Sequence, residues 1–152
     1  MNELFRYLLL SCLIVINQIF LASGIWSITP DIFLIQTLIM TTFVKKIPNV
    51  YFFILKGFLI DLFFSNVAMP YTITFGLIGL YLNFASLKWI QRSLLEQIML
   101  ILFVSLILNI MLFTTNDFAN GMNSRIVINP ILNTIVWSLI FINQRQKWLK
   151  NI

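Results

Sequence analysis

The sequence predicts an all-α, polytopic membrane protein, folded as one integral membrane domain over residues 1–152 with about six transmembrane helices. Hydrophobic residues make up 60% of the chain and charged residues only 10%, and the mean hydropathy is +0.95. Soluble domains are roughly 45–50% apolar and about a quarter charged. A chain so poor in charge cannot cover its surface with groups that suit water, so the bilayer is the expected solvent.

Six apolar runs approach the roughly 20 residues that a helix needs to cross a hydrocarbon core. The expected spans are residues 4–22, 26–44, 50–66, 71–87, 94–115 and 126–144. The second is the weakest because Pro30 and Asp31 leave only Ile32 to Val44 free of breaks, so we expect it to be tilted, short or partly interfacial. The connecting loops are too short to hold a globular domain.

The first run is interpreted as a retained span and not as a signal peptide. Its small-residue stretch, Ala22 to Gly24, follows Phe20 and Leu21 and lacks a clean cleavage pattern. Cys12 is the only cysteine and lies within this run, so no disulfide framework or Cys/His metal spacing is possible. We expect Cys12 to be an apolar filler.

The distribution of basic residues predicts the orientation. With six spans and a cytoplasmic N-terminus, eight of the ten Lys and Arg residues fall on the cytoplasmic side, namely Arg6, Lys45, Lys46, Lys88, Arg92, Arg145, Lys147 and Lys150. Arg125 alone falls in an external loop, and Lys56 lies within a span. Short loops rich in Lys and Arg stay inside, so both termini are expected in the cytoplasm of a bacterial plasma (inner) membrane. The net charge of +5 therefore needs no nucleic-acid partner.

The titratable residues do not form a catalytic set. The chain has no histidine, which excludes His-dependent triads and zinc-protease helices. Its acids are Glu3, Asp31, Asp61, Glu96 and Asp117, and no two are placed as an evident intramembrane pair. Glu96 lies in the first turn of the fifth helix, where a carboxylate suits the helix dipole. We expect no enzyme activity, no cofactor and no metal.

The stretch Thr29-Pro30-Asp31 is typical of a helix start. Threonine can cap the N-terminus, proline suits the first helical position, and an acid suits the first turn. We therefore expect Thr29 to cap the second helix at the outer interface. Contact with a partner is the alternative role for these residues.

Two charged residues, Lys56 and Asp61, interrupt the third apolar run. Five residues correspond to about 140° around a helix, so the two side chains do not share a face and an ion pair between them would be poor. Lysine can snorkel towards the cytoplasmic interface, whereas an aspartate near mid-membrane needs a partner, protonation or a wet pocket. Gly57 shares a face with Asp61 and leaves room for another helix. Asp61 is either a hydrogen-bonded packing residue or a contact and function site.

Small and polar residues form stripes on the later helices. On the fourth helix they recur at spacings of three and four, at Thr72, Gly76, Gly79, Asn83 and Ser86. Similar pairs four residues apart occur on the fifth and sixth helices, at Ser105 with Asn109 and at Asn129 with Asn133. Such stripes are typical of close helix packing in lipid, and the alternative is that they line a solute cavity.

The ordered motifs resemble a known family. Asn17-Gln18-Ile19-Phe20 ends the first span and Pro30-Asp31 opens the second, followed by Ile47-Pro48-Asn49, Gly57, Leu59-Ile60-Asp61-Leu62 and Ser65. In order and spacing this set resembles the rod shape-determining protein MreD family, over nearly the whole chain. The resemblance implies a helical fold similar to the substrate-binding subunits of energy-coupling-factor transporters. It also gives the candidate structural or partner contacts Pro30, Asp31, Pro48, Gly57 and Asp61.

The resemblance implies a non-enzymatic scaffold subunit of the bacterial cell-elongation (rod) complex, which maintains cell shape during side-wall peptidoglycan synthesis. The implied partner is an MreC-like membrane protein, with the MreB filament and the RodA–penicillin-binding protein synthase reached indirectly. The alternative function is a small-solute (vitamin-type) transporter substrate-binding subunit, which the polar stripes favour. Against it, the first helix lacks the A-x-x-x-A docking pattern typical of those subunits.

Overall fold

The computed structural model describes residues 3–43, 47–64, 68–84, 89–115 and 122–149, which form helices and no strand. The α-helices are α1 (Glu3–Ala22), α2 (Ile32–Phe43), α3 (Val50–Phe64), α4 (Pro70–Phe84), α5 (Leu94–Thr115) and α6 (Met122–Leu149). Two short 3₁₀-helices, η1 (Ile25–Ile28) and η2 (Trp89–Gln91), precede α2 and α5. The all-helical prediction with six main helices is confirmed for this part of the chain.

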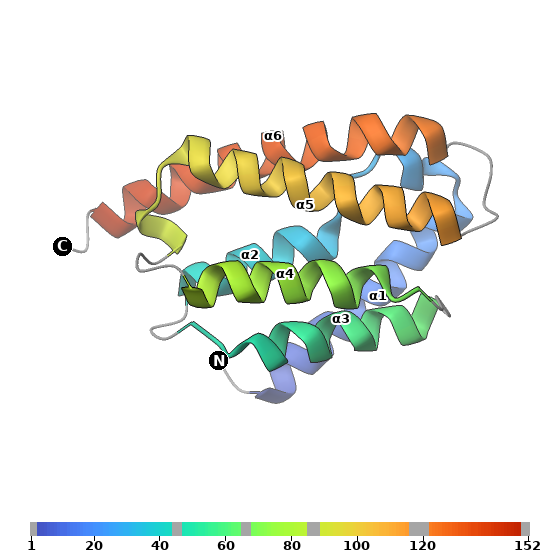
Figure 1. Ribbon diagram of the computed structural model, residues 1–152, viewed down its shortest axis with the longest axis horizontal. Helices are drawn as coiled ribbons and strands as arrows, with labels where there is room; N and C mark the ends of the chain where they lie inside the picture. Colours follow the sequence, from blue (N-terminus) through green and yellow to red (C-terminus); the bar gives the residue numbers. More distant parts are fainter. Residues whose placement is uncertain (1–2, 44–46, 65–67, 85–88, 116–121, 150–152) are drawn as a thin grey trace.

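The helices run back and forth along one long axis (Figure 1). α3 packs against α4, and α5 packs against α6. The ends of α2, α4 and α6 and the starts of α3 and α5 lie at one end of the bundle (Figure 1). η1 and the starts of α4 and α6 lie at the opposite end, which we call the η1 end.

α2 is the central helix of the bundle. Its side chains are buried on nearly every side, including Phe33 and Leu34, which are both fully buried. A helix that is apolar all round belongs inside a protein, and the sequence IFLIQTLIMTTF has this character. Phe33 also makes edge-to-face contacts with the rings of Phe64 and Tyr71, at centroid distances of 6.1 and 5.6 Å.

The helix lengths support two of the six predicted spans, and the other four stay a prediction. Only Leu94–Thr114 of α5 and Ser124–Gln146 of α6 are long and apolar enough to cross a membrane by length and composition, among the residues described. α2, α3 and α4 have 12, 15 and 15 residues, or roughly 18–22 Å at about 1.5 Å per residue. Residues 44, 65–66 and 85–87 of the expected spans 26–44, 50–66 and 71–87 lie outside the described residues. The second, expected to be weakest, contains the shortest helix.

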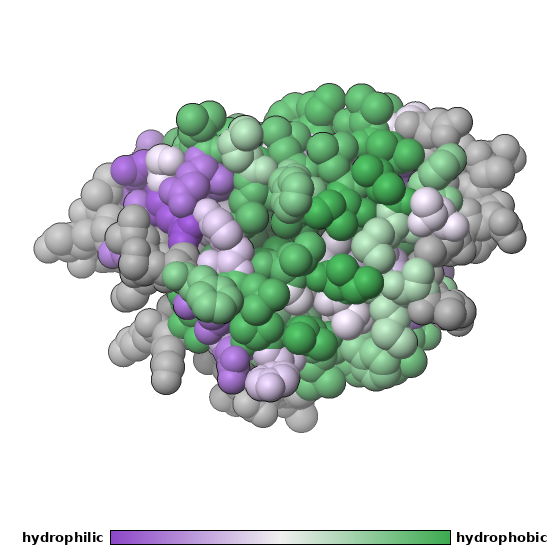
Figure 2. Space-filling view, viewed as in Figure 1, coloured by the Kyte–Doolittle hydropathy of each residue, from purple (hydrophilic) through white to green (hydrophobic). Residues whose placement is uncertain are grey.

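The surface of the bundle is strongly apolar. Figure 2 shows hydrophobic side chains over the middle of the face formed by α3, α4 and α5, with hydrophilic residues gathered towards one end. Large hydrophobic residues with at least 60% of their surface exposed are Tyr51, Phe63, Phe84, Leu95, Met99, Phe103, Val127 and Leu139. Monomeric soluble proteins rarely expose so much contiguous apolar surface. This surface favours contact with lipid or with another apolar surface.

α3 and α4 approach each other through glycine. A Cβ atom added at Gly57 would lie 2.4 Å from the Tyr71 carbonyl oxygen, and one at Gly79 would lie 2.8 Å from the Phe53 ring. The predicted stripe on α4 is therefore a packing surface against α3 at Gly79. It is looser at Gly76, where an added Cβ would lie 3.4 Å from Ile54. Ser86, the last member of the stripe, is outside the described residues.

We expect Gly57→Ala to destabilise the protein by about 1–3 kcal/mol, because overpacking forces neighbouring backbone to move. Gly76→Ala is the matched control, since its new methyl group meets only a flexible side chain at an ordinary distance. Thermal unfolding of both variants in detergent measures the difference. Equal unfolding temperatures for the two variants would contradict the close approach of α3 and α4.

Candidate functional site

Asp31 is the N-cap of α2. Its Oδ1 atom accepts a hydrogen bond from the Leu34 N–H at 2.9 Å, which is the usual bond of a capping side chain to the third helical residue. Thr29 instead donates its hydroxyl to the Trp26 carbonyl oxygen at 3.0 Å. The prediction that Thr29 caps the helix is therefore wrong. Thr29 stabilises the turn of η1, and Pro30 joins that turn to the capping residue.

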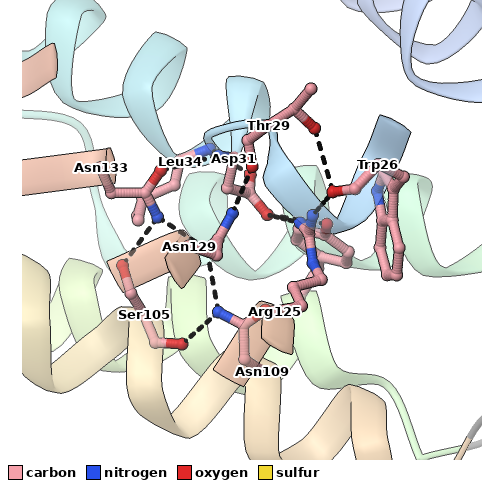
Figure 3. A network of polar contacts seen from close by, with 10 residues as sticks. Trp26, Thr29, Asp31, Leu34, Ser105, Asn109, Arg125, Asn129 and Asn133 are labelled. Carbon is pink, nitrogen blue, oxygen red and sulfur yellow. Dashed lines mark hydrogen bonds and ion pairs between the residues drawn. The ribbon is translucent and has the colours of Figure 1, made fainter. Parts of the chain in front are cut away.

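The second oxygen of Asp31 holds two other helices. Oδ2 accepts the Tyr71 hydroxyl of α4 at 2.9 Å and lies 3.8 Å from Arg125 Nη2 of α6. The side chains of Asp31 and Arg125 are each only 1% exposed. A buried charge is costly unless it is paired and hydrogen-bonded, so this acid and base stabilise each other. Figure 3 shows how the network converges on Asp31.

Arg125 is a residue whose role the sequence analysis missed. We counted it as the one basic residue of an external loop, but it lies in the first turn of α6 and is 1% exposed. It donates to the Trp26 carbonyl oxygen, and its guanidinium carbon lies 3.7 Å from the centre of the Trp26 ring. One available signal was spacing, because Arg125 precedes Asn129 and Asn133 by four and eight residues and so shares their face.

Amide side chains extend the network from α6 to α5 and to the start of α2. Asn133 accepts the Asp31 N–H at 2.7 Å and donates to the Ser105 hydroxyl at 2.9 Å. Asn129 accepts from the Asn109 amide at 2.9 Å and donates to the Thr29 carbonyl oxygen at 2.8 Å. The predicted pairs on the fifth and sixth helices therefore face each other and bond across the interface (Figure 3).

Asp61 caps α4 from outside that helix. It accepts the Tyr71 N–H at 3.1 Å, the Thr72 N–H at 2.7 Å and the Thr72 hydroxyl at 2.7 Å. α4 begins at Pro70, so these are its first available N–H groups, and the side chain of Met69 before it has no oxygen to accept them. Asp61 is 2% exposed and hydrogen-bonded inside the bundle, which matches the first of the two roles left open for it. It lies in the last turn of α3, however, and not at mid-helix, because α3 ends at Phe64.

Lys56 corrects a second prediction. We expected it to snorkel to the cytoplasmic side, but its side chain is buried with 7% exposed. Its Nζ atom donates to Gln36 Oε1 at 2.6 Å and to Thr37 Oγ1 at 2.7 Å, both on α2. The absence of a Lys56–Asp61 ion pair was predicted correctly, since the two residues bond different helices. Lys56 therefore connects α3 to α2.

The remaining candidates lie towards the other end of the bundle. The Pro48 carbonyl oxygen accepts the Asn83 amide at 3.0 Å, which ties the start of α3 to the end of α4. Glu96 accepts from Arg92 at 2.7 Å and from the Tyr81 hydroxyl at 3.0 Å. The ion pair joins the turn before α5 to the first turn of α5, and the Tyr81 hydroxyl connects Glu96 to α4. Of the other cytoplasmic basic residues predicted, Lys45, Lys46, Lys88 and Lys150 are outside the described residues.

The polar side chains of this site connect neighbouring helices. Tyr71 connects both carboxylates, because its N–H bonds Asp61 and its hydroxyl bonds Asp31. Both acids are occupied by donors from neighbouring helices. Within the described ranges no group of three or more His, Cys, Asp or Glu residues could hold a metal ion, and Cys12 is exposed on α1.

No family model, no curated protein and no solved structure matches the chain.

We expect Asp61→Leu to destabilise the protein by about 2 kcal/mol, because it removes three hydrogen bonds worth on average about 0.6 kcal/mol each in a membrane protein. Asp61→Asn should lie between this variant and the wild type, since its NH₂ group cannot accept the N–H groups of α4. Thr72→Val is the matched control, which removes only the hydroxyl bond. Thermal unfolding in detergent gives the order, and wild-type stability of Asp61→Leu would contradict the capping role.

Proposed function

We propose that this protein is a non-enzymatic membrane subunit of the bacterial cell-elongation (rod) complex. In this role it maintains cell shape during side-wall peptidoglycan synthesis. The proposal rests on the resemblance to the MreD family, which is carried by an ordered series of short motifs from Asn17 to Ser65. It places the chain in the bacterial plasma membrane as a multi-pass protein.

One observation carries the proposal: the motif residues are engaged in holding helices together. Asp31 caps α2 and binds α4 and α6, while Asp61 caps α4. Gly57 allows α3 and α4 to touch, and Pro48 bonds the end of α4. Residues used in this way suit a protein that presents a fixed surface to partners. A catalyst would need some of them free to meet a substrate.

The exposed apolar surface gives the proposed subunit room for partners within the bilayer. In the proposal an MreC-like membrane protein binds it directly. The MreB filament and the RodA–penicillin-binding protein synthase are reached through that protein. Since much of α5 and α6 remains exposed and apolar, a partner's transmembrane helix has a surface to pack against without rearranging the bundle.

The proposed topology has six membrane-embedded helices with both termini in the cytoplasm. It is supported by the eight-to-one distribution of basic residues. Arg92, just before α5, and Arg145, near the end of α6, lie towards the same end of the bundle (Figure 1). The helices α2, α3 and α4 are short, and they fit this arrangement if neighbouring helices separate their ends from lipid. The side chains that cap α2 and α4 satisfy the N–H groups at two of these ends.

Single cysteines in a Cys12→Ala background test the topology. A membrane-impermeant maleimide added to intact cells should not label Lys45→Cys or Lys147→Cys, because both positions are expected in the cytoplasm. It should label Asp117→Cys, which serves as the positive control. Labelling of position 45 or 147 from outside would overturn the proposed orientation.

Affinity purification from native membranes tests the function. We expect an MreC-like protein to co-purify with the tagged chain, and we expect depletion of the chain to turn rod-shaped host cells round. Re-expression of the wild type or of the Gly76→Ala control should restore rods, which separates loss of the protein from side effects of depletion. Unchanged rod shape and wall elongation after depletion would contradict the proposal.

A further inference from the structure

One buried basic side chain, Lys56, has no acidic partner among the residues described. Three described basic side chains are buried: Arg92, Arg125 and Lys56, which are 4%, 1% and 7% exposed. Arg92 pairs with Glu96 at 2.7 Å, and Arg125 lies 3.8 Å from Asp31. Lys56 has no carboxylate within 4.0 Å among the residues described. Its charge is therefore the least compensated in the interior, in a place where an unpaired charge is costly.

The polar groups around Lys56 leave hydrogen-bond donors unused. An ammonium group has three donors, and Lys56 uses two of them on neutral oxygens of Gln36 and Thr37. On another side, Nζ lies 5.8 Å from the centre of the Phe75 ring. Gln36 accepts from Lys56 through Oε1, and its side-chain amide also carries an NH₂ group, which is a donor. The cation and the amide thus both offer donors.

Lys56 and Gln36 belong to the lining of a cleft whose surface is mostly apolar. Lys56 and Gln36 are the polar members of its wall, and the rest is apolar, formed by residues such as Leu10 of α1, Met40 of α2 and Leu59 of α3. Leu55 lines the same cleft and is 54% exposed, so the cleft opens at the surface of the bundle. A ligand can therefore enter from outside, through the apolar surface that would face lipid.

The size of the cleft limits what can occupy it. The cleft measures about 50 Å³, and one water molecule needs roughly 10–15 Å³ of such space. A carboxylate or a phosphate monoester fits this volume, whereas pockets for whole drug-sized ligands measure about 300–1,000 Å³. The remainder of the ligand must lie in the open, apolar mouth, which suits an alkyl chain.

We propose that this cleft between α1, α2 and α3 binds the acid head group of a single-chain amphiphile, a fatty acid or an alkyl phosphate. The head group meets Lys56 Nζ and the Gln36 amide, and the chain leaves past Leu55 along the surface. Binding supplies the missing negative charge, and charge-assisted hydrogen bonds are the stronger class. This ligand site goes beyond the scaffold function proposed above and stands on separate residues.

Native mass spectrometry of the delipidated full-length protein tests the site with four probes: dodecanoate, dodecyl phosphate, dodecanol and inorganic phosphate. We expect at least one of the two acids to bind ten or more times more tightly than dodecanol, which has the same chain without the charge. The tighter acid identifies the source of the ligand as a free fatty acid or a lipid phosphate. If inorganic phosphate binds as tightly as dodecyl phosphate, the alkyl chain contributes nothing and the proposal of an amphiphilic ligand is wrong. If dodecanol binds as tightly as both acids, the proposal that Lys56 recognises a negative charge is wrong.

Variants locate the binding. Lys56→Met keeps an unbranched side chain without the charge and should abolish the preference for acids over dodecanol. Arg145→Gln removes an exposed cation of α6 and is the matched control, which should keep the preference. An unchanged preference in Lys56→Met would overturn the proposed site.

A diazirine-bearing fatty acid provides a measurement on the wild type, which does not depend on any variant folding. Its photo-crosslinks should fall in α1, α2 and α3, on residues that line the cleft. Crosslinks confined to α5 and α6 would overturn the proposal. Loss of cell shape plays no part in this result, so the ligand site and the scaffold function can fail independently.

Discussion

The structure depends on how the N-termini of two short helices are satisfied without water. The first N–H groups of a helix have no partner within it, and the starts of α2 and α4 lie in the interior of the bundle, where Asp31 and Tyr71 are each 2% exposed. Asp31 supplies an acceptor for α2 and Asp61 supplies acceptors for α4. Tyr71 then joins the two carboxylates, since one residue bonds both. The capping of α2 and α4 is therefore one connected arrangement, and it fixes how α2, α3, α4 and α6 meet.

A carboxylate is a useful cap here because it has more acceptor sites than one helix end consumes. Asp31 uses one oxygen on its own helix and the other on Tyr71 and Arg125. Asp61 contributes nothing to its own helix start and serves only α4. Each acid thus accepts N–H groups at the start of a helix and, through the same carboxylate, connects that helix to another one. The glycine at position 57 belongs to the same arrangement, because it lets the Tyr71 backbone approach α3 closely.

Much of the fold could be predicted from the sequence, because apolar runs and small-residue spacings are local signals. The helices, the small-residue approach of α3 and α4 and the amide pairs of α5 and α6 followed from such patterns. The roles of Lys56 and Arg125 did not, because each depends on a group far away in the chain. Thr29 was assigned wrongly for a local reason, since its hydroxyl bonds the Trp26 carbonyl oxygen three residues before it. Lys56 bonds residues 19 and 20 positions before it, and Arg125 bonds the Trp26 carbonyl 99 positions away. Charge and reach alone favour an exposed position for both cations, and only the fold reveals nearer partners.

The segment between α1 and α2 shows why α6 carries its polar face. Residues 23–30 are not α-helical, so their backbone N–H and C=O groups need partners other than those of a regular helix. Arg125 and Asn129 supply donors to the carbonyl oxygens of Trp26 and Thr29, and Asn133 accepts the Asp31 N–H. These three residues lie four apart on α6, so one helical stripe bonds three backbone groups between η1 and the start of α2. The polar face of α6 therefore fixes where the 12-residue helix α2 begins.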